Sequence, residues 1–278
     1  MFRLGVSAAT AAALATVVVL PAAEAHAQQF VPCAAAALRS AITTANDVAG
    51  PAHLFLAPGC TYTLTALDSV TVTGNVSAIS GAGGGIGSSG TLNLRDSTVS
   101  HNVSTNNGGG VASSGTANIS NTTITGNTAK DTGGGLDARG SLTLTGSRVT
   151  DNAARLDGGG ISAFMLTGTV TDTLVQGNDT AADNDGGGGI LNRRSTLTLE
   201  RTTVLANRVI ETGATGGAIS SIAGASLILR NSSVTNNYAG GAPGGIFNHE
   251  STVSLTATTV ADNFPTNCAP GVFAGCAD

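Results

Sequence analysis

The hydrophobic and polar positions of this chain repeat with a period of about 25 residues. The clearest column pairs an aliphatic residue with an asparagine three positions later, and this pair recurs eight times. The pairs are Val72/Asn75, Val99/Asn102, Ile124/Asn127, Val149/Asn152, Val175/Asn178, Val204/Asn207, Val234/Asn237 and Val260/Asn263. In the last seven copies a serine or threonine lies two positions before the aliphatic residue, and another aliphatic residue lies five positions before it. Glycine runs that end in an aliphatic residue form one more column.

Each repeat contains three short stretches in which apolar and polar residues alternate. One copy has them at residues 91–94, at residues 97–99 and at Val111, directly after the glycines. Alternation with a period of two predicts strands with one buried face, and parallel stacking places equivalent residues about 4.8 Å apart. The predicted fold is therefore all-β, a right-handed single-stranded parallel β-helix of about eight coils over residues 66–264. A β-sandwich is the alternative.

Two residue types mark the predicted turns. Asparagine tolerates the left-handed backbone conformation, and its amide can bond to the asparagine of the next coil. The asparagine column therefore predicts a ladder at a turn. Glycine before the third strand predicts a bend with a positive φ or a close approach of two backbones.

The two ends of the chain depart from the repeat. Residues 34–46 are the only segment with convincing helical periodicity, and we expect a short capping helix there to cover the open N-terminal end of the β-helix. This N-terminal cap, which includes the first strand, is predicted to occupy residues 28–65. Residues 265–278 lack a strand pattern, and we expect them to form a turn-rich tail closed by a disulfide.

The cap and the repeats both resemble known families. Cys33, the segment 38–42 (LRSAI), Asn46 and the segment 54–64 (LFLAPGCTYTL) resemble the N-terminal cap of secreted bacterial proteins with a CSLREA motif. Residues 70–263, in which a Gly-Gly-aliphatic element alternates with a short segment ending in Asn, resemble the repeats of polymorphic outer membrane proteins. The resemblance implies a right-handed parallel β-helix of the pectate-lyase-like superfamily, whose members are often found on the cell surface.

Residues 1–27 have the pattern of a cleaved secretory signal peptide. Arg3 lies in a short basic start, an apolar run covers residues 8–20, and small residues flank His26 before the predicted cleavage after Ala27. The alternative is a membrane anchor, but a spanning helix needs about 20 apolar residues, more than this run provides. We expect the mature chain to be a secreted, extracellular monomer, or one held at the cell surface, with no membrane span.

The four cysteines form two local pairs. In an exported protein an even number of cysteines predicts disulfide bonds, here between Cys33 and Cys60 and between Cys268 and Cys276. Metal binding by these thiols is the alternative. It is disfavoured because the sequence has no Cys-x-x-Cys motif and its histidines beyond residue 27 are far from the cysteines in sequence.

The composition narrows the possible functions. Gly, Thr, Ser and Asn make up 121 of the 278 residues, which excludes a helical protein. A net charge of −5 argues against a nucleic-acid partner, since phosphate binding needs an excess of Lys and Arg. The chain has no tryptophan and only 3% aromatic residues, which argues against a glycan-cleaving cleft.

One strip of outward positions is the candidate ligand face. It follows the strand after the glycines and contains Arg139, Phe164, Arg193, Arg194 and His249. Ordinary solvated surface is the alternative. Two carboxylates on this strip, those of Asp137 and Glu250, are four coils or about 19 Å apart, too far to act on one glycosidic bond. We therefore predict no catalytic residues.

An acidic cluster precedes the glycine runs of three consecutive coils. It consists of Asp131, Asp157, Asp183 and Asp185. Stacking of the coils would bring carboxylates of adjacent coils within about 5 Å, a spacing that suits a shared Ca²⁺ ion. A solvated acidic edge is the alternative, and no cofactor is predicted.

These observations favour a secreted, non-catalytic β-helix protein that serves as a structural or adhesion element at the cell surface or in the extracellular matrix. The repeat columns explain nearly every aliphatic residue, asparagine and glycine, and no reactive constellation remains. The expected partner is a cell-wall or extracellular polysaccharide or protein, bound along the side of the β-helix. The alternative is an extracellular polysaccharide lyase or glycoside hydrolase with its site on the strip from Asp137 to His249, because the same fold also carries such enzymes.

Overall fold

The structure is a computed structural model that describes residues 28–32, 37, 40, 53–56, 67–77, 83–181, 186–270 and 273–276. At the N-terminal end, β1 (Gln28–Val31) pairs in parallel with β2 (His53–Leu56). Of the predicted capping helix only Ala37 and Ser40 are described, both in helical conformation. The predicted signal peptide and the predicted Cys33–Cys60 disulfide lie outside the described residues and stay predictions. No helix in the described ranges is long and apolar enough to span a membrane.

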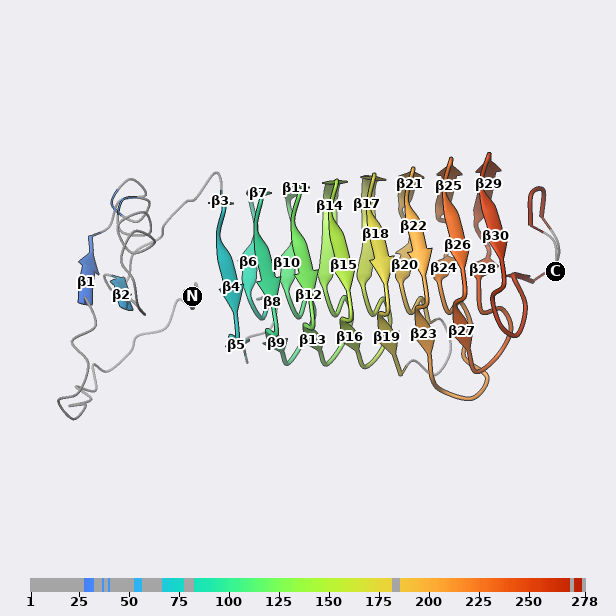
Figure 1. The fold of residues 1–278 in the computed structure, drawn as a ribbon, viewed down its shortest axis with the longest axis horizontal. Coiled ribbons are helices and arrows are strands. Elements are labelled where there is room, and N and C mark those ends of the chain that lie inside the picture. The colour runs from blue at the N-terminus through green and yellow to red at the C-terminus, as the bar shows by residue number, and fades with distance from the viewer. Residues whose placement is uncertain are drawn as a thin grey trace.

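The chain from Leu67 onward coils through three parallel sheets, with each coil stacked on the one before it (Figure 1). The first, which we call the wide sheet, comprises β3 (Leu67–Asp68), β6 (Ile86–Ser88), β7 (Thr91–Arg95), β10 (Val111–Ser113), β11 (Thr116–Ser120), β14 (Leu136–Thr145), β17 (Ile161–Thr171), β20 (Ile190–Arg193), β21 (Thr196–Glu200), β24 (Ile219–Ile222), β25 (Ser226–Arg230), β28 (Ile246–His249), β29 (Thr252–Thr256) and β31 (Cys268–Ala269).

The other two sheets are built from shorter strands. The middle sheet comprises β4 (Thr71–Thr73), β8 (Thr98–Ser100), β12 (Thr123–Thr125), β15 (Arg148–Thr150), β18 (Leu174–Gln176), β22 (Thr203–Leu205), β26 (Ser233–Thr235) and β30 (Thr259–Ala261). The narrow sheet comprises β5 (Val76–Ser77), β9 (Val103–Ser104), β13 (Thr128–Ala129), β16 (Ala153–Ala154), β19 (Asp179–Thr180), β23 (Arg208–Val209) and β27 (Tyr238–Ala239).

Equivalent residues of successive repeats are register partners in parallel strands. In the middle sheet Val99 pairs with Ile124, which pairs in turn with Val149. The middle sheet has 8 strands and the narrow sheet has 7, which corresponds to about seven complete turns. The predicted parallel β-helix and its repeat register are confirmed.

The make-up of the sheets differs from the prediction. The strand after the glycines and the strand that holds Leu94 belong to one sheet, and their equivalents merge into single strands in β14 and β17. The third sheet is instead the narrow one, whose two-residue strands directly follow the ladder asparagines. Two residues are too few to show an alternation of apolar and polar positions, so the sequence pattern did not reveal these strands.

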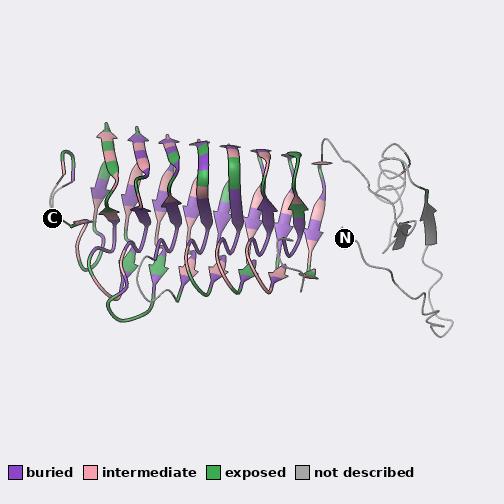
Figure 2. Cartoon of the chain, turned by 180° about the vertical axis from the view of Figure 1, so that it is seen from behind, coloured by how far each residue is buried: buried purple, intermediate pink, exposed green. Residues whose placement is uncertain are grey.

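The predicted aliphatic columns form the core. Leu94, Ile119 and Leu144 occupy one column of the wide sheet, and each is at most 1% exposed. Buried and exposed segments alternate along the strands of the β-helix (Figure 2). Burial of one such side chain contributes about 1.5–3 kcal/mol to stability, so stacked columns hold successive coils together.

The predicted asparagine ladder is confirmed, and it lies inside the β-helix. Asn127 is fully buried, and its backbone N–H and its Nδ2 both donate to Oδ1 of Asn152, at 3.0 and 2.9 Å. Its Nδ2 also donates to the carbonyl oxygen of Val99 at 3.0 Å. The same bonds link the asparagines from Asn75 to Asn263. The ladder satisfies backbone groups that a turn in the interior would otherwise leave unpaired.

The expected left-handed conformation of the ladder asparagines is wrong. The positive φ belongs to the residue directly before each of them, and these residues are Gly74, His101, Gly126, Asp151, Gly177, Ala206, Asn236 and Asp262. The amide must point inward to reach the next coil, whereas the sharp change of direction occurs one position earlier. Ladder formation and turn formation are therefore divided between two adjacent residues.

The glycine runs make the predicted close approach between backbones. Gly133 has a φ of 68° and begins the bend. A Cβ atom added at Gly134 would lie 2.4 Å from the carbonyl oxygen of Gly159 in the next coil, a contact that no larger residue can make. The glycine turns therefore set how tightly the coils stack at this corner.

The C-terminal segment is a cap built onto the last coil. Cys268 and Cys276 form the predicted disulfide, with their Cα atoms 6.3 Å apart. Both cysteines are buried in the core cluster, and Phe273 packs against that cluster. The expectation that residues 265–278 contain no strand is wrong, because β31 pairs with β28 of the wide sheet.

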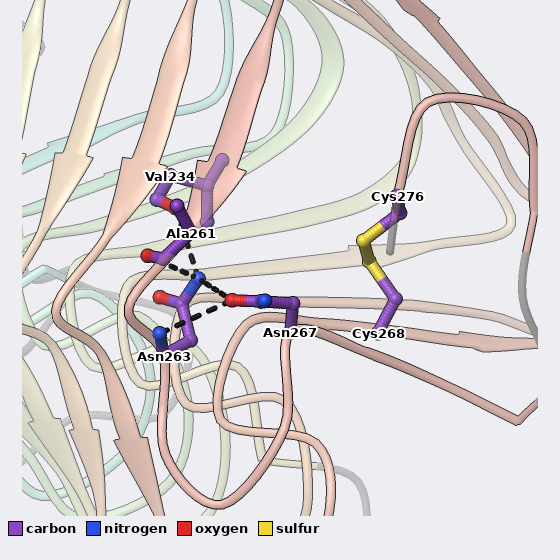
Figure 3. The surroundings of a disulfide bond; sticks show 6 residues. All are labelled: Val234, Ala261, Asn263, Asn267, Cys268 and Cys276. Carbon is purple, nitrogen blue, oxygen red and sulfur yellow. Dashed lines mark hydrogen bonds between the residues drawn. A yellow bond between two sulfur atoms is a disulfide. The ribbon is translucent and has the colours of Figure 1, made fainter. Parts of the chain in front are cut away.

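The asparagine ladder ends within this cap. Oδ1 of Asn267 accepts hydrogen bonds from the backbone N–H and from Nδ2 of Asn263, at 3.1 and 2.9 Å (Figure 3). Asn267 thus takes the place that the asparagine of a further coil would occupy. The cap satisfies the polar end of the ladder while its disulfide loop covers the apolar end of the core.

Candidate functional site

The predicted ligand residues gather on the outer face of the wide sheet, in the part of each coil that follows the glycines. Phe164 is the register partner of Arg193, Arg193 of Ile222, and Ile222 of His249. Arg139 lies beside Phe164 at a register shift between β14 and β17. We call the column of Arg139, Phe164, Arg193, Ile222 and His249 the cationic strip.

Contacts within the cationic strip connect its charged and aromatic members. The Cζ atom of Arg139 lies 5.4 Å from the centroid of the Phe164 ring, a cation–π geometry. At the other end of the strip, the His249 ring stacks on the Phe247 ring with centroids 6.0 Å apart. Arg139 and Arg193 are two coils, or about 10 Å, apart along the β-helix axis.

Arg194, the remaining predicted ligand residue, does not join this column. It lies in the turn after β20 with a φ of 53°, and its backbone N–H donates to the carbonyl oxygen of Ile222. Its exposed side chain leaves the strip at the adjoining turn. Four of the five predicted ligand residues are therefore brought into one column.

Several neighbouring positions that sequence alternation places outside are nevertheless buried. Asp137 and Leu191, which share one column, are 4% and 3% exposed, and Leu191 is not part of the core cluster. The glycine turns explain this burial. A Cβ atom added at Gly108 would lie 2.8 Å from the Cβ of Ala112, the residue that precedes Asp137 in the same column. The turns thus fold over the outer side of this column and cover it.

Asp137 is the acid of the site whose pKa departs from its ordinary value. Burial raises the pKa of its carboxyl group above the ordinary value, while the charge of Arg139 and hydrogen bonds from Ser162, Thr132 and Arg139 act in the opposite direction. Thr132 Oγ1 lies 3.4 Å from Oδ1, and Arg139 Nε lies 3.3 Å from Oδ2. Sequence reasoning named Asp137 but missed Thr132 and Ser162, because only the folded turn brings them to the carboxyl group.

Arg193 is the more buried of the two arginines in the strip. Its side chain is half-buried, and its Nε atom is buried without a hydrogen-bond partner among the described residues. A buried donor left unpaired costs about 1–3 kcal/mol. The cationic strip can offer positive charge and an aromatic face to one ligand.

The predicted acidic cluster is described only in part. Asp131 and Asp157 lie at the turns before two successive glycine runs, while Asp183 and Asp185 lie outside the described residues. Oδ1 of Asp131 is 3.9 Å from a terminal nitrogen of Arg155, which partly neutralises this edge. Within the described ranges no three His, Cys, Asp or Glu side chains form a group that could hold a metal ion. The Ca²⁺ site at all four aspartates stays a prediction.

The fold and the strip define a parallel β-helix with a laterally exposed face, and comparison with known proteins agrees with this class. Residues 68–264 match the family model for a right handed beta helix region. Because this match covers more than half of the chain, the protein belongs to the right-handed β-helix family. No curated protein and no solved structure matches the chain.

Proposed function

We propose that this protein is a secreted, non-catalytic β-helix that binds an extended extracellular polysaccharide or protein along its cationic strip. The observation that carries the proposal is the alignment of Arg139, Phe164, Arg193 and His249 in one column of stacked coils. A column that runs along the β-helix axis offers repeated contacts to a polymer. Its two guanidinium groups select a partner with negative charges about 10 Å apart.

The arrangement of acids supports a binding role over hydrolysis. A glycoside hydrolase needs two carboxyl groups within about 5–9.5 Å of each other. Asp137 and Glu250 are separated by four coils of the wide sheet, or about 19 Å. Asp137 itself is covered by a glycine turn and hydrogen-bonded to Thr132, which restricts its access to a substrate.

The proposal is tested by binding of the purified chain to an insoluble cell-wall fraction and to immobilised polygalacturonate and alginate. We expect Arg139→Ala/Arg193→Ala to weaken binding strongly, because both guanidinium groups face the partner. The matched control is Arg148→Ala/Arg230→Ala, which removes the same charge from exposed positions outside the strip. Equal binding by the two double variants would contradict a role for the strip.

One observation favours the competing function, an extracellular polysaccharide lyase or glycoside hydrolase. Burial raises the pKa of Asp137, as in acids that donate a proton during catalysis. Incubation of the chain with pectin, alginate, chondroitin and hyaluronan separates the two functions. Sustained release of unsaturated or reducing sugar that is lost in Asp137→Asn would establish the enzyme and overturn the non-catalytic proposal.

A further inference from the structure

The cationic strip contains an ion pair whose acid is buried. Nε of Arg139 donates to Oδ2 of Asp137 at 3.3 Å, and the Asp137 side chain is 6% exposed whereas the Arg139 side chain is 44% exposed. In the other ion pairs of the described chain the acid is at least 29% exposed. Among these acids, solvent therefore screens the charge of Asp137 least.

An ionised Asp137 compensates the charge of Arg139. An anion that approaches the strip is attracted by the outer guanidinium and repelled by the carboxylate that lies behind it. A protonated Asp137 carries no charge, whereas the guanidinium keeps its charge throughout. Protonation of one buried group therefore adds one unit of positive charge to the strip.

Arg139 does not depend on Asp137 alone for its position. Its Cζ atom lies 5.4 Å from the centroid of the Phe164 ring, and this contact does not require a charge on the carboxyl group. The hydrogen bond to Asp137 uses Nε, and the two terminal nitrogens of Arg139 make no hydrogen bond to a described residue. The guanidinium thus stays on the strip and keeps donors for an anionic partner in both states of Asp137.

The groups that face Asp137 allow it to titrate as a single site. Hydrogen bonds reach its carboxyl group from Ser162 of β17 and from Thr132 of the turn before the glycines, and neither hydroxyl ionises. Its register partner in β10 is Ala112. Arg139 supplies the charge that acts on it. Burial nevertheless raises the pKa of Asp137, so it takes up its proton at a higher pH than an unperturbed aspartate.

The other titratable groups of this region are Lys130 and Asp131 of the same turn and His249 of the strip. Asp131 lies 3.9 Å from Arg155 of the next coil. Neither Lys130 nor Asp131 contributes to the pKa shift of Asp137. His249 belongs to the binding surface itself, so an experiment on Asp137 must remove its titration.

On the basis of the proposed function, we propose that Asp137 controls the affinity of the cationic strip for anionic partners. The ionised carboxylate weakens binding because it compensates the charge of Arg139. Protonation releases that charge, so the strip binds an anionic polymer more tightly as the pH falls. By linkage, a bound polyanion favours the protonated carboxyl group, and binding takes up a proton.

Binding of dextran sulfate across a pH series tests this control. The sulfate groups of this probe stay ionised, and all proteins carry His249→Gln, which removes the other titratable group of the strip. At about pH 7.5 we expect added Asp137→Asn to tighten binding about two- to fivefold, the effect of one exposed ion pair. This ratio should approach one as the pH falls to about 4, because the reference protein then protonates Asp137 itself. Other carboxyl groups titrate in both proteins and leave the ratio unchanged.

The matched control is Asp179→Asn in the same His249→Gln protein. Asp179 accepts two hydrogen bonds from Arg208 in the narrow sheet, at 2.9 and 2.7 Å. Its substitution also releases one guanidinium and changes the net charge equally, but on a different sheet. We expect no gain in affinity from this control. An equal gain from both substitutions, or no gain from Asp137→Asn, would overturn the control by Asp137.

A second measurement leaves Asp137 in place. Calorimetry of the His249→Gln protein with dextran sulfate, in buffers of different ionisation enthalpy, should detect net proton uptake at about pH 5, and Arg139→Ala should reduce it. Binding without proton uptake would contradict the inference.

The inference and the proposed function fail in different ways. Absence of binding at every pH, or binding that Arg139→Ala/Arg193→Ala leaves unchanged, would overturn both. Binding that needs these two arginines but is equal with and without Asp137→Asn would overturn the inference alone. Thermal melting reports whether each variant is folded.

Discussion

Inward and outward positions of the wide sheet belong to the same strands but perform different tasks. In β14, Leu142 and Leu144 are at most 1% exposed and join the core cluster, whereas Thr143 between them is exposed. The inward columns hold the coils together by excluding water, and their composition is constrained by packing. The outward columns add little to stability, so their chemistry is free to serve recognition.

Asparagines inside and outside the β-helix show the same contrast. Inside, Asn152 donates from Nδ2 to Ile124 and Asn178 and accepts two hydrogen bonds from Asn127. Outside, Asn118 makes one side-chain hydrogen bond, to Asn93. Both asparagines bond to an equivalent asparagine in an adjacent coil, but only the buried one has no water to replace a lost bond.

The largest effect is expected when a charge is moved from one face of a strand to the other. Leu144→Asp places an unpaired carboxylate in the core and should prevent folding. Thr143→Asp places the same group in solvent and should change stability by about 0.5 kcal/mol or less. Circular dichroism and thermal melting of the two variants measure the difference. Similar melting temperatures would show that the inward and outward registers are assigned wrongly.

A smaller effect is expected from removal of single asparagines. Asn152→Ala leaves four hydrogen bonds unmade in the interior and should destabilise the protein by about 3–5 kcal/mol. Asn118→Ala loses one bond at a half-exposed position and should cost about 0.5 kcal/mol. Urea unfolding of both variants gives the two free energies of unfolding. A cost for Asn118→Ala that equals the cost for Asn152→Ala would contradict the division between the faces.

The smallest effect concerns two carboxyl groups whose pKa values shift in opposite directions. Burial raises the pKa of Asp137, so its ionisation opposes folding, and stability is lost as the pH rises through the folded-state pKa. Asp137→Asn should therefore be more stable than wild type at neutral pH, and the advantage should disappear below about pH 4. Melting temperatures across a pH series measure this change.

Asp172 provides the control of opposite sign. The hydrogen-bonded guanidinium of Arg201 lowers the pKa of Asp172, so its ionisation favours folding and this contribution is lost as the pH falls through the folded-state pKa. Asp172→Asn should be slightly less stable than wild type at neutral pH, because the pair is exposed and screened. A pH dependence of the same sign for both variants would refute the burial argument for Asp137.

Much of the fold could be predicted because parallel stacking in register converts a sequence period into a spatial column. The asparagine column became a buried ladder, and the column of Leu94 became part of the core. The position of the left-handed residue could not be read in this way. Gly74, Asp151 and Ala206 share a conformation but not a residue type, so no column of identical residues marks it.

The candidate site shows the same limit. The sequence alone determined that Phe164, Arg193 and His249 lie in equivalent positions of the stacked coils, since this follows from counting along the repeat. Only the tertiary structure decided that Asp137 is buried, that Thr132 and Ser162 contact its carboxyl group, and that Asn267 ends the ladder. These features depend on how a turn folds back over a strand. The path of such a turn is set by contacts between segments that do not recur at the repeat period.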